Sequence, residues 1–373
     1  MKIHPFGVTV LHGVLLSLSF GASAAVFDNI YVFGDSLSDQ GNVSLLTSGA
    51  IPGSDYFNGR FSNGPIYVDG LAQGLGLAVS QLVAPMLSPP FPAWSPGGGN
   101  NFAYGGARTD SHRSGLPLGL DSQVAAFANG APAADADALY VVFAGANDVQ
   151  DAIGIANDSP TEVAAAMTDP LVAFGAVENA AQNVASAIRD LAATGARHFF
   201  VPNGPDWALV PAVIEMESGH AGLAGFGDFA RDVSLAFNDR LAVELNAIGL
   251  ASPAIDILSF DFSALLREMV DNPALYGFTN ISMSCYDGDD LGFSGGGSVC
   301  THPDEYLFWD RIHPTAAAHA VLASRFLAAI PEPASLLLFV LGVSVLLLIM
   351  RRHDRSVCPL RRVALGPGHA SMS

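Results

Sequence analysis

The chain is almost without lysine. Among its 373 residues the only lysine is Lys2, and 16 Lys+Arg stand against 35 Asp+Glu, which gives a formal net charge of -19. A protein that binds a nucleic-acid backbone neutralises phosphates with clustered basic side chains, and this composition offers no such cluster. We therefore expect no nucleic-acid partner, and the acidic excess is typical of solvated surface charge.

Cysteine is scarce too, with three in the chain. No Cys-x-x-Cys or His-Glu-x-x-His spacing occurs, so the sequence predicts no metal site. Cys285 and Cys300 share one loop rich in Gly, Ser and Asp. If the chain is exported, we expect them to form a disulfide, with two free thiols as the alternative. Cys358 lies near the end of the chain, without an evident partner.

The first residues predict export. Lys2 precedes an apolar stretch over 8–20, followed by Ala22-Ser23-Ala24. This order is typical of a secretory signal peptide cut by signal peptidase, here over residues 1–24. The alternatives are a buried helix and an uncleaved membrane anchor, for which the apolar core is short.

A second apolar segment lies near the other end. Pro331-Glu332-Pro333 precedes an apolar run over 334–350, and Arg351 and Arg352 follow at once. As a helix the run is about 25 Å long, adequate for a bilayer, and the arginines favour a cytoplasmic end. The three-part order resembles the PEP-CTERM sorting signal of Gram-negative bacteria, although here a tail over 356–373 follows the arginines. The resemblance implies that an exosortase-like processing enzyme acts on 330–355 and that the helix is in the membrane at least transiently. The protein would then be located in the periplasm, at the cell surface or in the extracellular matrix. The alternative is that it stays anchored in the inner membrane through 334–350.

Between these segments, residues 25–329 read as one α/β domain. Continuous apolar runs over 29–33, 139–144, 198–202 and 254–258 predict buried parallel strands. Helical stretches over 171–193, 229–247 and 315–329 alternate with them. This alternation predicts a three-layer α/β/α architecture around a parallel sheet.

Polar residues with complementary chemistry follow the strands. Ser36, in Gly34-Asp35-Ser36-Leu37, follows the first run, and Asp310 and His313 lie three residues apart before the last helix. A serine becomes a nucleophile when an imidazole takes its proton and a carboxylate holds that imidazole. Taken singly, Ser36 could be a turn or helix-cap residue and Asp310 a cap of the helix near 315.

Two further segments complete a family pattern. They are Gly145-Ala146-Asn147-Asp148 and the glycine pair in Asn101-Phe102-Ala103-Tyr104-Gly105-Gly106-Ala107; alone, Asn147 could merely form an Asx turn. With Gly34-Asp35-Ser36-Leu37 and Asp310-x-x-His313, in this order, they resemble the four blocks of the GDSL, or SGNH, esterases and lipases.

The resemblance extends from about residue 28 to 329 and implies a flavodoxin-like SGNH hydrolase fold. It makes Ser36 the nucleophile, His313 the base and Asp310 the residue that orients it, with no cofactor. Three donors would form the oxyanion hole: the N–H of Ser36, the N–H of Gly105 and the side chain of Asn147. Gly106 is the alternative to Gly105.

The sequence thus predicts a secreted serine ester hydrolase that acts on lipid esters or acylated carbohydrate. The sorting signal suggests an exopolysaccharide setting, hence O-deacetylation of a surface polysaccharide. The alternatives are a catalytically idle exported surface or matrix protein, and an acyltransferase that uses the same serine. We expect Asp35 and Asp148 to fix turns, and His319 to face solvent or an interface.

Overall fold

The computed structural model describes residues 27–81, 98–111, 118–130, 133–288, 296–330 and 342. All but position 342 belong to one compact unit, Val26–Pro331. The expected signal peptide (1–24), the tail (356–373) and almost all of the expected sorting segment (330–355) lie outside the described residues. Within the described part, no helix is long and apolar enough to cross a membrane.

A parallel sheet forms the centre of this unit. Its strands lie in the order β1-β2-β3-β4, and neighbouring strands pair in parallel, with Ile30 opposite Leu139 and His198 opposite Asp256. The continuous apolar runs explain the first three strands, which are almost completely buried. The predicted α/β class is confirmed, with strands β1 Ile30–Gly34, β2 Leu139–Phe143, β3 His198–Pro202 and β4 Asp256–Phe260.

The fourth strand differs from its prediction. We expected a buried strand over 254–258, whereas β4 covers Asp256–Phe260 and is largely half-exposed, with Asp256 and Ser259 exposed. The reason is its position at the end of the strand order, where it is paired with β3. A strand at an edge needs less apolar surface than one between two neighbours.

Another extended segment lies on the opposite side of β1. Phe102 donates its N–H to the Val32 carbonyl at 2.7 Å, Val32 donates to the Asn100 carbonyl at 3.0 Å, and Asn101 forms a parallel bridge with Val32. Counted as a strand, this segment gives the order 2-1-3-4-5, which is the flavodoxin-like arrangement. In such sheets, ligands bind beyond the carboxyl ends where the order reverses, which here is at β1.

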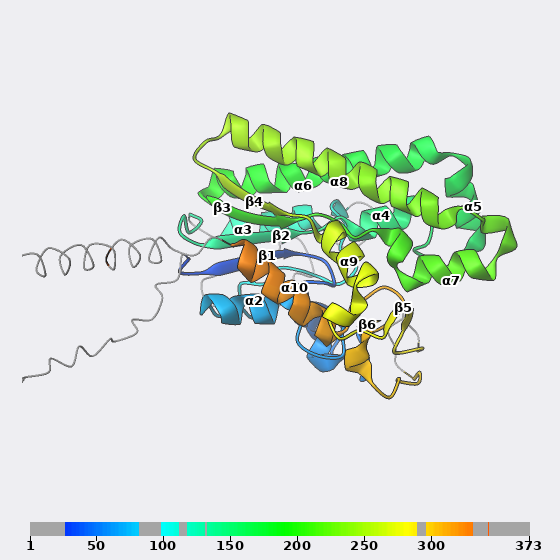
Figure 1. Ribbon diagram of the computed structural model, residues 1–373. Helices are drawn as coiled ribbons and strands as arrows, with labels where there is room; N and C mark the ends of the chain where they lie inside the picture. Colours follow the sequence, from blue (N-terminus) through cyan, green and yellow to red (C-terminus); the bar gives the residue numbers. More distant parts are fainter. Residues whose placement is uncertain are drawn as a thin grey trace, which may run out of the picture. The chain divides into compact units, whose positions relative to one another are not determined.

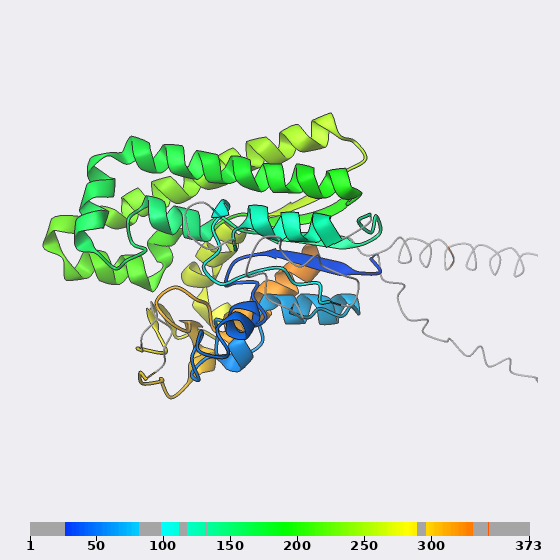
Figure 2. The same ribbon diagram turned by 180° about the vertical axis from the view of Figure 1, so that it is seen from behind.

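Helices cover both faces of the sheet (Figures 1 and 2). Helices α3 Leu120–Gly130, α6 Pro170–Thr194 and α8 Phe226–Ala251 lie on one face, and α2 Tyr67–Leu75 and α10 Ala316–Ala329 on the other. The expected helices over 171–193, 229–247 and 315–329 are therefore present. Thr315 caps α10, because its side chain accepts the N–H of Ala318.

The remaining elements lie mainly around the carboxyl ends of the strands, where Figure 1 shows α9 beside a small second sheet of β5 and β6. The α-helices and strands are α1 Asn42–Leu46, α4 Ala146–Ala152, α5 Pro160–Thr168, α7 Pro211–Gly219, α9 Phe262–Asp271, β5 Asn280–Ser284 and β6 Tyr306–Phe308. Short 3-10 turns are η1 Phe57–Gly59, η3 Trp207–Leu209, η4 Ala221–Leu223, η5 Pro273–Leu275 and η6 Pro303–Glu305.

Candidate active site

Ser36 lies in the turn that follows β1. The strand ends at Gly34, where a Cβ atom would lie 2.2 Å from the carbonyl oxygen of Phe143 in β2, so only glycine fits. Gln123 of α3 binds both backbone groups of Gly34, accepting its N–H at 2.9 Å and donating to its carbonyl at 2.8 Å. The turn is therefore held by the sheet and by α3, and Ser36 is 8% exposed.

Three side chains form a continuous hydrogen-bonded chain. Ser36 Oγ lies 2.9 Å from His313 Nε2, and His313 Nδ1 lies 2.7 Å from Asp310 Oδ2. Ser36 and His313 are 277 residues apart in sequence, so the fold brings them together. A proton on Nδ1 that faces the carboxylate leaves Nε2 free to accept the serine proton.

The carboxylate of Asp310 is completely buried. Its Oδ1 accepts the N–H groups of Ile312 at 2.8 Å and His313 at 2.7 Å, which closes the turn between the two residues. Burial raises the pKa of Asp310, but the charge of His313 and hydrogen bonds from His313, Ile312 and Tyr56 together hold that pKa below its usual value. Asp310 is therefore ionised beside the imidazole at neutral pH.

The glycine pair lies next to Ser36, but its first member is engaged elsewhere. Gly105 donates its N–H to Asp39 Oδ2 at 2.9 Å. Asp39 also accepts the N–H groups of Gly41, Asn42 and Val43, and burial raises its pKa to about 6 against these four hydrogen bonds. Gly106 has a φ of 74°, and among the described residues its N–H has no acceptor.

Asn147 is the second residue of α4, the helix that follows β2. Its side-chain amide donates to the Ala107 carbonyl at 3.0 Å, which ties α4 to the glycine loop. An amide nitrogen carries two hydrogens, and no acceptor for the second lies among the described residues. Ser36, Gly106 and Asn147 follow three adjacent parallel strands, and all three line one hollow with His313.

Two other aspartates fix turns around the site. Asp35 accepts the Leu37 N–H at 3.1 Å, and Asp148 accepts both the N–H and the hydroxyl of Thr109, at 2.9 and 2.8 Å. Burial raises the pKa of Asp35 to about 7 and that of Asp148 to about 6. Through these hydrogen bonds, Asp35 holds the turn that contains Ser36, and Asp148 holds the loop at Thr109 next to Asn147.

The expectation for His319 was wrong. Its side chain is 1% exposed, and its Nδ1 accepts the N–H of Tyr67 at 3.2 Å. Burial lowers its pKa to about 3, so the ring is neutral and joins α10 to the start of α2. His313 lies before α10 rather than within it, so counting helical turns from His313 gave the wrong face.

Cys285 and Cys300 form a disulfide with an S–S distance of 2.00 Å. Cys285 directly follows β5, and Cys300 donates its N–H to the Cys285 carbonyl at 2.8 Å. The bridge closes a loop of which residues 289–295 lie outside the described part.

Three aspartates of the described part lie close enough together to share a metal ion. They are Asp28, Asp135 and Asp137, just before β1 and β2, at the end of the sheet away from Ser36.

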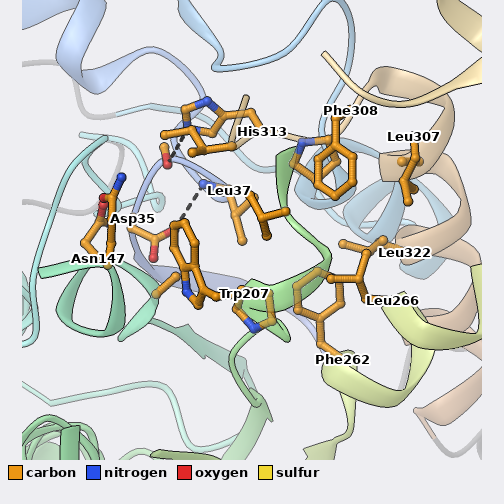
Figure 3. Close-up of a pocket in the computed structure, with 18 of the residues that line it drawn as sticks. Asp35, Leu37, Asn147, Trp207, Phe262, Leu266, Leu307, Phe308, His313 and Leu322 are labelled. Atoms are coloured by element: carbon orange, nitrogen blue, oxygen red, sulfur yellow. Dashed lines mark hydrogen bonds between the residues drawn. The ribbon is translucent and has the colours of Figure 1, made fainter. Parts of the chain in front are cut away.

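A second hollow, mostly apolar, also opens at Ser36. Figure 3 shows Asp35, Asn147 and His313 on one side of it and a group of apolar side chains on the other. The apolar residues labelled there come from the loop after β1, from η3, from α9, from β6 and from α10: they are Leu37, Trp207, Phe262, Leu266, Leu307, Phe308 and Leu322. The wall of this hollow away from His313 is therefore largely hydrocarbon.

The family model described as GDSL-like lipase/acylhydrolase matches residues 30–326, which is most of the chain. The chain belongs to this family. It is accordingly a carboxylic-ester hydrolase. The matched span starts with β1 and ends within α10, so it includes the strands of the central sheet and the loops that carry Ser36 and His313.

Curated GDSL relatives are distant in sequence. Acetylajmalan esterase 2 of Rauvolfia serpentina is 28% identical over 359 residues, covering 84% of this chain and 93% of the relative. Lipase 1 of Photorhabdus luminescens is 25% identical over 374 residues, covering 85% of this chain and 52%, or about half, of the lipase. A solved extracellular lipase from Streptomyces rimosus has 14% identity and a TM-score of 0.41, covering 81% of this chain and 98% of that structure.

The sequence of this GDSL chain predicts that four residues share one site, and the structure brings them together: Ser36, Asn147, Asp310 and His313. It missed Asp39, which binds the glycine loop, and Tyr56, whose hydroxyl donates to Asp310 Oδ2 at 2.8 Å. The Asp39-Gln40-Gly41-Asn42 segment carried a partial signal, because an aspartate before the start of a helix often accepts its first N–H groups. Tyr56 had no such local signal.

Proposed function

We propose that this GDSL-family chain is an exported serine esterase in which Ser36 is the nucleophile, His313 the general base and Asp310 the residue that orients His313. The observation that carries the proposal is the hydrogen-bonded chain from Ser36 Oγ through His313 to Asp310, at 2.9 and 2.7 Å. Each of the three residues is at most 8% exposed, so the hydrogen bonds between them are shielded from bulk water.

The reaction has two halves. Ser36 Oγ attacks the ester carbonyl while His313 Nε2 takes its proton, and collapse of the tetrahedral intermediate releases the alcohol, to which His313 returns that proton. Water then attacks the acyl-Ser36 ester with His313 again as base, which releases the acid and restores Ser36. Asp310 stays ionised throughout and stabilises the charged imidazole.

The negative oxygen of the intermediate needs donors that are not already used. We propose the N–H of Ser36, the N–H of Gly106 and the second side-chain N–H of Asn147. Gly106 replaces Gly105 in this proposal because the Gly105 N–H already binds Asp39. Such donors typically contribute about 3 kcal/mol each to transition-state stabilisation.

The acyl group should occupy the apolar hollow beside Ser36. Its lining by Leu266, Phe308 and Leu322 favours a hydrocarbon chain longer than acetyl, since burying each CH₂ contributes about 0.8 kcal/mol. We therefore propose that acylated lipids, or carbohydrates with longer acyl groups, are better substrates than O-acetylated polysaccharide.

The ends of the chain would set its location. We propose that signal peptidase removes 1–24 and that an exosortase-like enzyme acts on 330–355, which leaves the hydrolase domain (25–329) in the periplasm, at the cell surface or in the extracellular matrix. The Cys285–Cys300 disulfide supports export, because such bridges persist in oxidising compartments. Cell fractionation with an antibody to the domain tests this proposal, and finding the unprocessed chain in the cytoplasm would contradict it.

The activity is tested with p-nitrophenyl esters from acetate to palmitate, using the purified protein, Ser36→Ala and the exposed-residue control Ser218→Ala. We expect kcat to fall by about 10³-fold or more in Ser36→Ala and to stay unchanged in Ser218→Ala. The specificity constant should rise from acetate to medium chains. A folded wild type that hydrolyses none of the esters would favour the idle protein, and acyl transfer to an added sugar in preference to water would favour the transferase.

A further inference from the structure

Asp310 has a hydrogen-bond partner that the hydrolytic cycle does not use. The hydroxyl of Tyr56 donates to Asp310 Oδ2 at 2.8 Å, the same oxygen that receives His313 Nδ1 at 2.7 Å. Tyr56 is 5% exposed and lies 254 residues before Asp310 in the sequence. Because the backbone N–H groups of Ile312 and His313 donate to Oδ1, each oxygen of the carboxylate has two hydrogen-bond partners.

Tyr56 belongs to a small aromatic cluster that is separate from the main core. Its buried members are Tyr56, Cys285, Tyr286 and Trp309. The rings of Tyr286 and Trp309 stack at a centroid distance of 5.5 Å, and Tyr56 meets Tyr286 edge-on at 5.6 Å. We call this set the Tyr56 cluster. One of its members, Trp309, directly precedes Asp310 in the sequence.

The disulfide ties the Tyr56 cluster to the loop of Asp310. Cys285 donates its N–H to the Phe308 carbonyl at 3.1 Å, and Tyr286 donates to the Trp309 carbonyl at 2.7 Å. Trp309 in turn donates its N–H to the His313 carbonyl at 2.7 Å. The segment after β5 therefore continues to pair with the chain up to the residue before Asp310, and the Cys285–Cys300 bridge fixes that segment.

We infer that Tyr56 is a positioning residue for Asp310, and that the disulfide-anchored Tyr56 cluster holds this hydroxyl in place. The inference rests on the proposed roles of Ser36, His313 and Asp310. A carboxylate with one fixed rotamer keeps His313 in a single orientation and tautomer, which the attack by Ser36 requires. A hydrogen bond to a charged group has the geometry and strength to fix that rotamer.

Tyr56 should also influence the protonation of the site. Among the described residues, the titratable groups that face Asp310 are His313 on its own loop and Tyr56 on the loop before η1. Asp35 on the turn after β1 and His319 of α10 interact with His313. Removing the Tyr56 hydroxyl leaves Oδ2 less stabilised as an anion, so its attraction for the imidazole proton increases. We therefore expect the acidic limb of the rate profile to move to higher pH.

The first test is Tyr56→Phe, with Tyr276→Phe as the matched control. Tyr276 likewise donates its hydroxyl to a carboxylate, that of Glu268, but near the surface and away from Ser36. For Tyr56→Phe we expect kcat to fall about tenfold with KM within about twofold, an acidic limb at higher pH and an almost unchanged melting temperature. Tyr276→Phe should match the wild type.

The second test removes the anchor with the double change Cys285→Ala and Cys300→Ala, correcting kcat for the folded fraction measured by circular dichroism. We expect a several-fold lower kcat, and a combination with Tyr56→Phe that loses less than the product of the two separate losses. A wild-type kcat and pH profile in Tyr56→Phe would overturn the positioning role. Losses that simply multiply would overturn the role of the disulfide. A Ser36→Ala variant that keeps its activity would instead overturn the proposed function on which both depend.

Discussion

Ser36 and His313 are held by structures of different kinds. Ser36 follows β1, whose five residues are buried in the central sheet, and Gln123 binds the end of that strand. His313 follows β6, a three-residue strand paired with β5, and its loop packs against the Tyr56 cluster. The two supports meet at the hydrogen bond between Ser36 Oγ and His313 Nε2, at 2.9 Å.

This difference separates stability from chemistry. The sheet and its helices contain most of the buried apolar side chains, so damage around Ser36 affects folding as well as activity. The loop of Asp310 and His313 depends more on hydrogen bonds and on a few aromatic rings. Small parts of a protein can loosen locally without global unfolding. We therefore expect changes on this second side to affect kcat more than the melting temperature.

The largest effect should come from Asp310→Asn. The asparagine oxygen can still accept the N–H groups of Ile312 and His313, so the turn survives, but an amide group then faces His313 Nδ1. The imidazole would turn to its other tautomer, with the proton on Nε2, and would no longer accept the proton of Ser36. We expect kcat on a p-nitrophenyl ester to fall by about 10³- to 10⁴-fold.

The control for this change is Asp304→Asn, at an exposed aspartate before β6. The comparison holds if Asp310→Asn keeps a melting temperature close to that of the control. A melting temperature many degrees lower would show that the loop is part of the main folding core, and would break the distinction between the two supports.

A smaller effect is expected on the side of the sheet, from Asn147→Ala. The change removes the side-chain donor that we propose for the oxyanion, together with the hydrogen bond to the Ala107 carbonyl. We expect kcat to fall by about 10²- to 10³-fold, with KM little changed, because the lost donor acts mainly in the transition state. The control is Asn157→Ala, at an exposed asparagine that donates to Glu162. A KM that rises with an unchanged kcat would contradict the oxyanion role.

The two supports also differ in how well the sequence predicted them. Buried parallel strands carry a local signal, a continuous apolar run, and β1, β2 and β3 were placed within about a residue. Ser36 and Asn147 followed from those strand ends. Asp310 and His313 were first singled out by their complementary chemistry, three residues apart, and the family pattern then joined them to Ser36 and Asn147. Their loop itself has no periodicity.

What the sequence could not predict depends on contacts between distant segments. Tyr56 meets Asp310 across 254 residues, and Gly105 meets Asp39 across 66, with nothing in either local sequence to indicate it. His319 looked exposed because one histidine on a helix gives no sign of which neighbour covers it, and here α2 does. Our proposal of Gly106 in place of Gly105 rests on the hydrogen bond from Gly105 to Asp39, which no local sequence signal predicts.

The smallest effect, and the one that compares the supports most directly, is on stability as pH changes. Burial, together with the nearby charge of Asp148, raises the pKa of Asp35 to about 7 from an ordinary value of 3.8, against the Leu37 hydrogen bond and the charge of His313. The stabilising contribution of its protonated form is complete below about pH 4 and is lost as pH rises through 7. Asp310 behaves oppositely, because its pKa is lowered and its contribution is lost in acid.

We therefore expect Asp35→Asn to gain in melting temperature relative to the wild type as pH rises from 5 to 8, by a few degrees, because the variant never buries a charge beside Ser36. Asp190→Asn, at an exposed aspartate of α6, should show no such trend. The measurement is thermal unfolding by circular dichroism at both pH values. A difference that stays constant with pH would mean that Asp35 is already ionised at pH 5. The turn at Ser36 would then tolerate a buried charge as readily as the loop of Asp310 does, and the two supports would not differ in this respect.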